Sequence, residues 1–394
     1  MTGGAAESAP GRVLVVIGTR PEAIKMAPVI SALRAHESGM DTRVLFTGQH
    51  TDLVDQVLEV FDLDPHWNLN LMREGQSVFD VAEGCLRELR PVLEEWSPDL
   101  LLVQGDTVTV FFAALAGFFL QVPVGHVEAG LRSGSKRAPF PEEGLRRLTS
   151  VVADLHFAPT EGARENLIRE GVPEQRIWVT GNPVVDALLE ISKEVHPVAD
   201  PRVQALLDEP DAHLILVTAH RRESFGAPLE RIFSAVRALA DREGVKILYP
   251  VHPNPNVAGP AIAALGEHPR IVLTEPLGYL DLVRAMAASS LILTDSGGIQ
   301  EEAPTFGVPV LVLRDLTERP EGVEAGVAHL VGSDPERILA TADRLLKQRK
   351  HATGDAYNPY GDGRAGMRIA TIVAAMLADP ARIGRLEGSE ARER

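Results

Sequence analysis

The chain of 394 residues contains only one cysteine, Cys85. A single cysteine excludes an intrachain disulfide and a cysteine-rich zinc site. Cys85 stands on the apolar face of a helical pattern, which predicts a core position rather than a reactive thiol.

Long hydrophobic runs are also missing. The longest apolar stretch, residues 111–120, is half as long as the roughly 20 residues that a membrane-spanning helix needs. Residues 1–10 have neither a basic run nor an apolar core, so they do not read as a signal peptide. We therefore expect a cytoplasmic protein whose ends, residues 1–11 and 381–394, are flexible.

Positive charge is scarce, since the formal net charge is −16 and the pI is about 5.2. This balance argues against nucleic acid or an anionic membrane as the main partner, because both require a cationic face. A small phosphorylated ligand needs only a local cluster of Arg, Lys and backbone N–H groups, so it is not excluded.

What the sequence does contain is a repeated alternation of short β-branched runs with amphipathic stretches. Such alternation predicts right-handed crossovers and parallel sheets. It weakens between residues 189 and 211, where three prolines occur, and then resumes. We predict an α/β fold with two Rossmann-like, doubly wound domains facing a central cleft. The expected strands are residues 13–17, 43–46, 100–103, 122–127, 155–158, 176–179, 214–217, 246–249, 270–273, 291–293 and 310–313.

In such folds, ligands lie at the carboxyl ends of the strands. After the first strand, residues 18–22 form a Gly-containing turn with Pro21 at a helix start, where Arg20 and Lys25 are within reach of a phosphate. Three carboxylates, Asp106, Glu128 and Glu142, follow later strands. One of them alone is as easily a helix cap, but three together suggest acid–base chemistry, because crowded carboxylates raise one another's pKa.

The second half carries an anion-binding pattern. The stretch Thr294-Asp-Ser-Gly-Gly298 follows a strand and opens a helix. The N–H groups of its last three residues, Ser296, Gly297 and Gly298, can point at a diphosphate, and the absence of a Cβ on the glycines allows close approach. Glu302 lies one turn further along the helix, where its carboxylate can accept a hydrogen bond from a ribose hydroxyl.

Two further cationic positions follow other strands of this half, His220 with Arg221 and Arg222, and Arg319. His252 lies in a proline-rich loop, and its residue type leaves a structural role and a ligand role equally open. The segment 294–298 is neither a Walker A loop nor a dinucleotide fingerprint, because it lacks the G-x-G-x-x-G spacing. The sequence therefore points to a nucleotide-linked ligand without a dinucleotide cofactor.

Together these motifs closely resemble the non-hydrolysing UDP-N-acetylglucosamine 2-epimerases of bacteria, in order from about residue 12 to about residue 377. The matching segments are Gly18-Thr-Arg-Pro-Glu-Ala-Ile-Lys25, Gly105-Asp-Thr107, His126-Val-Glu-Ala-Gly-Leu-Arg132, Pro141-Glu-Glu143, His220-Arg-Arg-Glu-Ser224, Asp295-Ser-Gly-Gly-Ile-Gln-Glu-Glu302 and Thr317-Glu-Arg-Pro-Glu321.

The resemblance implies a glycosyltransferase-B architecture and a homodimer that interconverts UDP-GlcNAc and UDP-ManNAc without metal or other cofactor. The first domain would comprise residues 12–188 and a C-terminal helix, 364–380, and the second residues 189–363. By position, Asp106, Glu128 and Glu142 become acid–base candidates, with His220 assisting the departing UDP. The matched UDP-sugar contacts are Arg20, Lys25, Asp106, Glu128, Arg146, His220, Leu277, Leu282, Ser296, Gly297, Gly298, Glu302 and Arg319.

Three departures from the family pattern stand out. Relatives commonly have Asn where this chain has Leu145, and a Phe often seen in the uracil pocket is Leu282 here. Some members have an allosteric UDP-GlcNAc site. Gln49, His50 and His252 match part of this site, but Asp52 and Gly75 replace its usual polar or basic contacts. The sequence therefore does not decide whether this chain has the allosteric site.

Three other functions compete with the epimerase. A hydrolysing relative would use the same carboxylates but release ManNAc and UDP. A glycosyltransferase of this fold would turn over only with an acceptor and has no need for three carboxylates at the sugar. A non-catalytic UDP-sugar sensor would bind UDP without exchanging the C2 proton.

Overall fold

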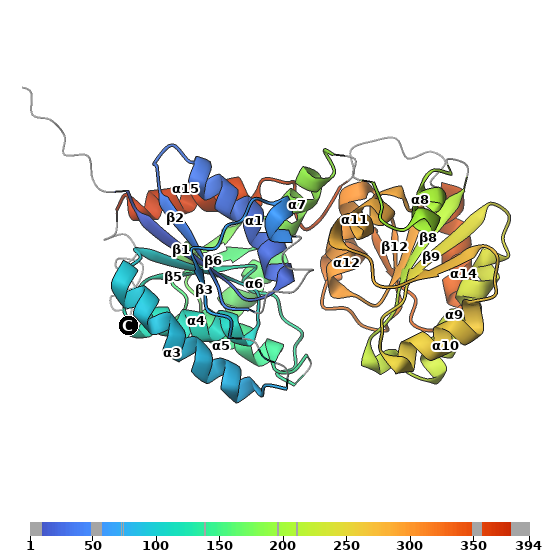
Figure 1. Ribbon diagram of the computed structural model, residues 1–394, viewed down its shortest axis with the longest axis horizontal. Coiled ribbons are helices and arrows are strands. Elements are labelled where there is room, and N and C mark those ends of the chain that lie inside the picture. Colours follow the sequence, from blue (N-terminus) through green and yellow to red (C-terminus); the bar gives the residue numbers. More distant parts are fainter. Residues whose placement is uncertain are drawn as a thin grey trace, which may run out of the picture. The chain divides into compact units, whose positions relative to one another are not determined.

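The computed structural model of the protein describes residues 10–48, 57–71, 73, 75–137, 139–194, 197–209, 212–348 and 357–379. The chain divides into two compact units (Figure 1). Unit 1 comprises residues 1–187 and 361–394, and unit 2 comprises residues 188–360. The chain thus leaves the first unit, forms the second and returns.

Unit 1 is built on a seven-stranded sheet with the order β3-β2-β1-β4-β5-β6-β7, in which all neighbours are parallel. The strands are β1 Arg12–Ile17, β2 Asp41–Phe46, β3 Trp67–Asn68, β4 Leu100–Gln104, β5 Val124–Val127, β6 Leu155–Ala158 and β7 Ile177–Val179. The strand order reverses between β1 and β4, and the loops at their carboxyl ends diverge there. This is where a doubly wound sheet binds its ligand.

Helices cover both faces of this sheet. They are α1 Arg20–Ala35, α3 Val78–Trp96, α4 Val108–Phe119, α5 Glu142–Val152, α6 Glu161–Arg169, α7 Pro183–Ile191 and α15 Ala365–Leu377. In Figure 1 the last helix, α15 in red, lies beside α1 in blue, and α3, α4 and α5 lie on the opposite face. Gly366 permits this contact, since a Cβ there would lie 2.6 Å from the carbonyl oxygen of Pro28.

Unit 2 repeats the pattern with a six-stranded parallel sheet in the order β10-β9-β8-β11-β12-β13. Its strands are β8 His213–Thr218, β9 Val245–Pro250, β10 Ile271–Thr274, β11 Leu291–Thr294, β12 Val310–Val312 and β13 Ala328–Leu330. Its helices are α8 Pro201–Leu207, α9 Ala227–Ala240, α10 Pro255–Leu265, α11 Tyr279–Ala288, α12 Gly297–Glu302, α13 Pro320–Glu324 and α14 Pro335–Gln348. Here the order reverses between β8 and β11.

The predicted fold class, α/β with two Rossmann-like parallel sheets of the glycosyltransferase-B type, is confirmed. The predicted strands all form, with ends shifted by a few residues. The short strands β3 and β13 were not predicted, because neither contains a β-branched residue and β3 has only two residues. Among the described residues, no helix combines the length and the apolar character needed to cross a membrane.

Candidate active site

The carboxyl edge of the unit 1 sheet brings together turns that are far apart in sequence. Thr107, which follows β4, caps α4 by accepting a hydrogen bond from Val110 N at 3.3 Å. Its hydroxyl also donates to Glu22 Oε1 at 2.8 Å, and Gly18 N donates to Glu22 Oε2 at 2.6 Å. Through Glu22, the turn after β1 and the turn that carries Asp106 are held as one surface.

Glu128 occupies the centre of this edge. Its side chain is buried, and its backbone φ of 63° lies in the left-handed region that few non-glycine residues adopt. A residue persists in that region only when its surroundings hold it there. The Glu128 carboxylate also lies against the turn before Asp106, since a Cβ on Gly105 would lie 3.9 Å from Oε2. The predicted neighbourhood of Asp106 and Glu128 is therefore present in unit 1.

Three donors converge on the Glu128 carboxylate. Lys25 Nζ donates to Oε1 at 2.6 Å, Asn182 Nδ2 donates to the same oxygen at 3.0 Å, and Gln104 Nε2 donates to Oε2. The side chains of Lys25 and Glu128 are 15% and 5% exposed, so the ion pair is shielded from water. Charge-assisted hydrogen bonds of this kind fix the orientation of a carboxylate.

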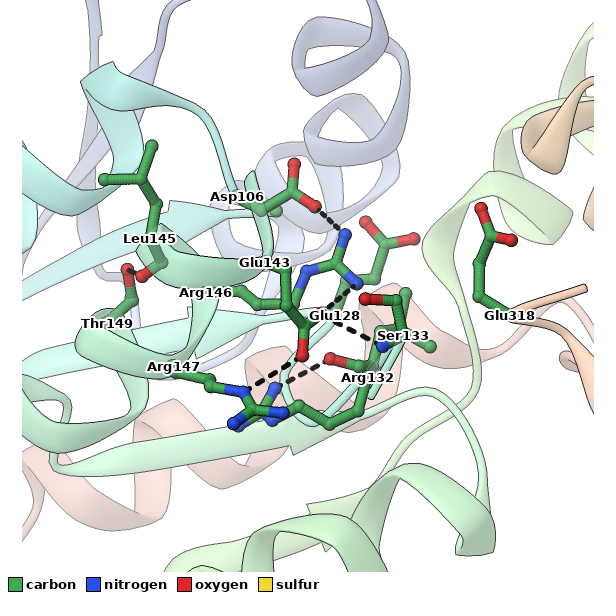
Figure 2. Close-up of polar contacts among 12 residues, drawn as sticks. Asp106, Glu128, Arg132, Ser133, Glu143, Leu145, Arg146, Arg147, Thr149 and Glu318 are labelled. Carbon is green, nitrogen blue, oxygen red and sulfur yellow. Dashed lines mark hydrogen bonds and ion pairs between the residues drawn. The ribbon is translucent and has the colours of Figure 1, made fainter. Parts of the chain in front are cut away.

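The other expected carboxylate, Asp106, pairs with Arg146. Figure 2 shows Arg146 between two acids, donating to Asp106 Oδ2 through Nη2 and to Glu143 Oε2 through Nη1, the latter at 3.2 Å. Arg147 Nε donates to the other Glu143 oxygen at 3.0 Å. Alternating charges thus run from Asp106 into α5, and they fix the arginine beside the acid–base candidate.

Of the two adjacent glutamates, Glu143 is the one that pairs with Arg146 and Arg147. Glu143 is fully buried, and its carboxylate also accepts a hydrogen bond from Ser133 N at 3.0 Å, which closes the loop between β5 and α5. Glu142, the predicted acid–base residue, is half-buried at the first residue of α5. Its role stays a prediction, and Glu143 is a structural residue of the site that the sequence analysis did not single out.

The departure at Leu145 does not alter these ion pairs. Leu145 is buried, and in Figure 2 its side chain points away from Asp106 and Arg146. Its carbonyl accepts a hydrogen bond from Thr149 Oγ1 at 2.9 Å. Successive residues of a helix face different directions, so Leu145 can point away while Arg146 contacts Asp106.

Two buried titratable groups support the turn that carries Asp106. Burial raises the pKa of Glu22 to about 7, against the opposing effect of the hydrogen bonds from Gly18 and Thr107. His126 is buried, which lowers its pKa to about 4, and its Nε2 lies 2.8 Å from the carbonyl oxygen of Gly105. A neutral imidazole donates a hydrogen bond to that carbonyl. At neutral pH His126 therefore holds the Gly105 turn in place and does not carry a proton.

In unit 2, Asp295 organises the loops after β8 and β11. It is fully buried, and its Oδ2 accepts hydrogen bonds from His220 N at 2.8 Å and Arg221 N at 2.9 Å. Its Oδ1 lies 3.6 Å from His220 Nδ1. The Gly-rich turn and the cationic turn of the sequence analysis are therefore joined through one aspartate, at the point where the strand order reverses.

His220 stands against a second imidazole. Its ring stacks on that of the exposed His252 with centroids 5.3 Å apart and planes 8° from parallel. Burial lowers the pKa of His220; Asp295 opposes the shift, whereas His252 and Arg221 add to it. His220 is thus mainly neutral near pH 7. The other residues predicted for the allosteric site, Gln49 and His50, lie outside the described residues.

Arg319 is brought directly to the Gly-rich turn. A Cβ on Gly297 would lie 2.9 Å from the guanidinium carbon of Arg319, so only glycine allows this approach. The guanidinium is held by Glu301, whose Oε1 accepts from Nε at 2.8 Å, and by Glu318 at 3.0 Å. Burial favours a raised pKa for Glu318, but Arg319 and Arg314 outweigh it and lower the pKa.

The remaining predicted contacts lie on the same edges. Glu302 folds back over Gly298, where an added Cβ would lie 3.3 Å from its Oε1. Leu277 follows β10 and Leu282 lies in α11, both half-buried. Arg20 is the first residue of α1 and is also half-buried.

Several site residues were missed for one reason. Gln104 is the last residue of β4, Asn182 follows β7, and Glu301 lies inside α12. A single amide or acid at such a position is too common to stand out in one sequence. For Gln104 and Asn182 the available signal was their place at or near a strand end, and it gains weight only once Glu128 is placed beside them.

Comparison with known proteins gives a consistent picture. The family model described as UDP-N-acetylglucosamine 2-epimerase matches residues 31–374. The UDP-N-acetylglucosamine 2-epimerase of Yersinia pestis is 50% identical over 366 residues, which cover 91% of this chain and 97% of that protein. The enzyme of the same name from Escherichia coli K12 is 48% identical over 365 residues, 91% of this chain and 97% of that one.

Solved structures agree. The crystal structure of UDP-GlcNAc 2-epimerase from Neisseria meningitidis bound to UDP-GlcNAc superposes with a TM-score of 0.83 at 42% identity. The match covers 92% of this chain and 100% of that one.

Proposed function

The chain belongs to the UDP-N-acetylglucosamine 2-epimerase family, and from this premise we propose that it interconverts UDP-GlcNAc and UDP-ManNAc without hydrolysing them. The observation that carries the proposal is the pair of strand-end carboxylates, Glu128 and Asp106, each held by a cation at the switch point of unit 1. Inversion at C2 requires a proton to leave one face of the sugar and return on the other, which is work for positioned carboxylates.

The proposed reaction has two halves, an elimination of UDP and its re-addition. A carboxylate takes the C2 proton, the C2–H electron pair forms the C1–C2 double bond, and the C1–O pair leaves with UDP in an anti elimination. The product is a bound 2-acetamidoglucal. UDP then attacks C1 again while a proton is delivered to the opposite face of C2. Which of Asp106, Glu128 and Glu142 removes the proton and which returns it stays open.

The leaving group must be kept in place between these halves. In our proposal the N–H groups of Ser296, Gly297 and Gly298 hold the diphosphate of UDP, with Arg319 as the cationic contact. The close packing of Arg319 on Gly297 supports this role, because it directs a guanidinium to the N–H groups of the turn. His220, mainly neutral, is suited to a hydrogen bond with the departing phosphate oxygen.

The two units would therefore divide the work. We propose that residues 12–188 with the helix 364–380 form the domain of the proton chemistry, and that residues 189–363 form the UDP domain. Arg20 and Lys25, at the start of α1, are expected to reach the phosphate from the first domain. Leu277, Leu282 and Glu302 would accommodate the uridine.

Product analysis separates the proposal from its rivals. Incubation with UDP-GlcNAc alone should produce UDP-ManNAc until both sugars coexist, with free UDP and ManNAc staying low. Steady accumulation of UDP and ManNAc would instead assign a hydrolysing epimerase. Turnover that depends on an added acceptor would assign a glycosyltransferase.

We further propose that the protein is a homodimer in the cytoplasm. The dimer is supported by an apolar surface on α4 and α5, where Phe118, Phe119, Leu148 and Val151 are 57%, 63%, 50% and 81% exposed. Clustered apolar side chains of this size favour a protein partner. Light scattering should give twice the mass of one chain for the wild type. The double variant Phe119→Asp, Val151→Asp should give the mass of a single chain. A wild-type monomer at micromolar concentration would refute the dimer.

A further inference from the structure

One short segment of unit 2, residues 358–360, grips both members of the Arg319–Glu301 ion pair through their main chains. Asn358 Nδ2 donates to the carbonyl oxygen of Glu301 at 3.0 Å. Tyr360 donates its hydroxyl hydrogen to the carbonyl oxygen of Arg319 at 3.3 Å. The two side chains are coupled, since Asn358 Oδ1 accepts from Tyr360 N at 2.9 Å.

The Tyr360 hydroxyl also completes the helix that begins after Arg319. Arg319 is the N-cap of α13, and its side chain makes no capping hydrogen bond. The first N–H groups of a helix need acceptors from outside it. Tyr360 supplies one, because its hydroxyl accepts from Gly322 N at 3.0 Å. The Arg319 side chain instead contacts Glu301, Glu318 and the Gly-rich turn.

The fit around this hydroxyl is close. Tyr360 is 2% exposed, and a Cβ on Gly322 would lie 2.9 Å from its hydroxyl oxygen. A buried hydroxyl that bonds two main-chain groups is costly to remove, because both groups lose their partner. The aromatic ring alone would fill the space but could not fasten the Arg319 turn.

We propose that Tyr360 is a positioning residue that sets Arg319 against the Gly297 turn for binding of the UDP diphosphate. The inference rests on the proposed function, in which Arg319 contacts that diphosphate. Tyr360 is also the last residue of unit 2, and the next residue, Gly361, belongs to unit 1. The residue that would position the phosphate contact is therefore also the residue at which unit 2 ends.

The test is a double-mutant cycle on UDP affinity in the full chain, measured by calorimetric titration. Tyr360→Phe should weaken UDP binding about two- to tenfold, the range for loss of one neutral hydrogen bond. In an Arg319→Ala background the same substitution should change affinity by less than about twofold, because a residue acting through Arg319 has nothing left to position. Tyr357→Phe is the matched control, since Tyr357 directly precedes this segment and is 70% exposed.

Kinetics give a second readout. Tyr360→Phe should raise KM for UDP-GlcNAc and leave kcat near the wild-type value, because the proton chemistry is assigned to unit 1. Gly322→Ala perturbs the same contact from the other side and should act in the same direction. It replaces Tyr360→Phe in the cycle if thermal unfolding shows that the phenylalanine variant does not fold.

Four results would overturn the inference. Wild-type UDP affinity in a folded Tyr360→Phe protein, or an equal loss with and without Arg319, would show that Tyr360 does not act through this arginine. Normal UDP binding by the Arg319→Ala protein would show that Arg319 does not contact the diphosphate, so that Tyr360 would have no contact to position. Failure of the wild type itself to bind UDP would refute the proposed function as well, and is recognised before any variant is made.

Discussion

Replacing Glu128 by Gln tests the centre of the unit 1 site with a minimal change of shape. The amide keeps one acceptor oxygen, but the negative charge opposite Lys25 is lost. Lys25 Nζ is 2.6 Å from Glu128 Oε1, and the two side chains are 15% and 5% exposed. The substitution therefore removes the counter-charge of a nearly buried ammonium group.

Two magnitudes follow from this geometry. Breaking a fully buried ion pair costs about 3–5 kcal/mol, but the remaining acceptor and the partial exposure of Lys25 reduce this to about 1–3 kcal/mol of unfolding free energy. The turnover rate should fall by more than the loss of folded protein alone would cause. Loss of a proton-transfer group lowers the rate about 10²–10⁴-fold, while UDP affinity should largely hold because most of the proposed UDP contacts belong to unit 2.

Three measurements on one preparation decide the outcome: thermal unfolding, UDP titration and initial rates of UDP-ManNAc formation. Glu94→Gln is the control, since Glu94 accepts from Arg90 Nε at 2.8 Å on the exposed face of α3. The control should lose less than about 0.5 kcal/mol and keep full turnover. A folded Glu128→Gln protein with near-normal rates would refute the assignment of Glu128 to proton transfer.

Three further predictions follow from the same contacts. Glu143→Gln should loosen Arg146 beside Asp106 and lower turnover about 10- to 100-fold with unchanged UDP affinity, and loss of UDP affinity instead would contradict it. Gly297→Ala should displace Arg319 and weaken UDP binding about tenfold by titration, whereas unchanged affinity would remove Arg319 from the phosphate contacts. The pKa of Glu22 is raised from 4.5 to about 7 by burial, so the folded state binds more protons between these values and stability declines by about 3 kcal/mol as pH rises from 4.5 to 7. Glu22→Gln should flatten that decline in unfolding experiments across pH, and an unchanged slope would mean that another group causes it.

Much of the fold was predictable because buried parallel strands have a recognisable sequence pattern. The runs at β1 and β8 are continuous β-branched and aliphatic stretches, and each is followed by a helical period. The two-residue strand β3 exists only because β2 offers its edge, so tertiary pairing rather than local pattern creates it. A sequence carries no separate sign of such an element.

The sequence predicted which turns carry the residues of the candidate site. It did not predict which side chains pair with one another there. Asp106 and Glu128 were expected from their place after strands, and unit 1 does bring them to one edge. The residue that holds Arg146 could not be chosen between Glu142 and Glu143, since adjacent helix positions differ only in the direction they face. That direction is set by the closure of Ser133 onto Glu143, a contact that spans the loop.

The most direct test of the central claim is hydrogen exchange at C2 of the sugar. Incubation of the wild-type protein with UDP-GlcNAc in heavy water should place deuterium at C2 of both UDP-GlcNAc and UDP-ManNAc, detected by NMR, with little free UDP. Binding of UDP without any deuterium at C2 would contradict the account and mark the protein as a sensor of UDP-sugars rather than an epimerase.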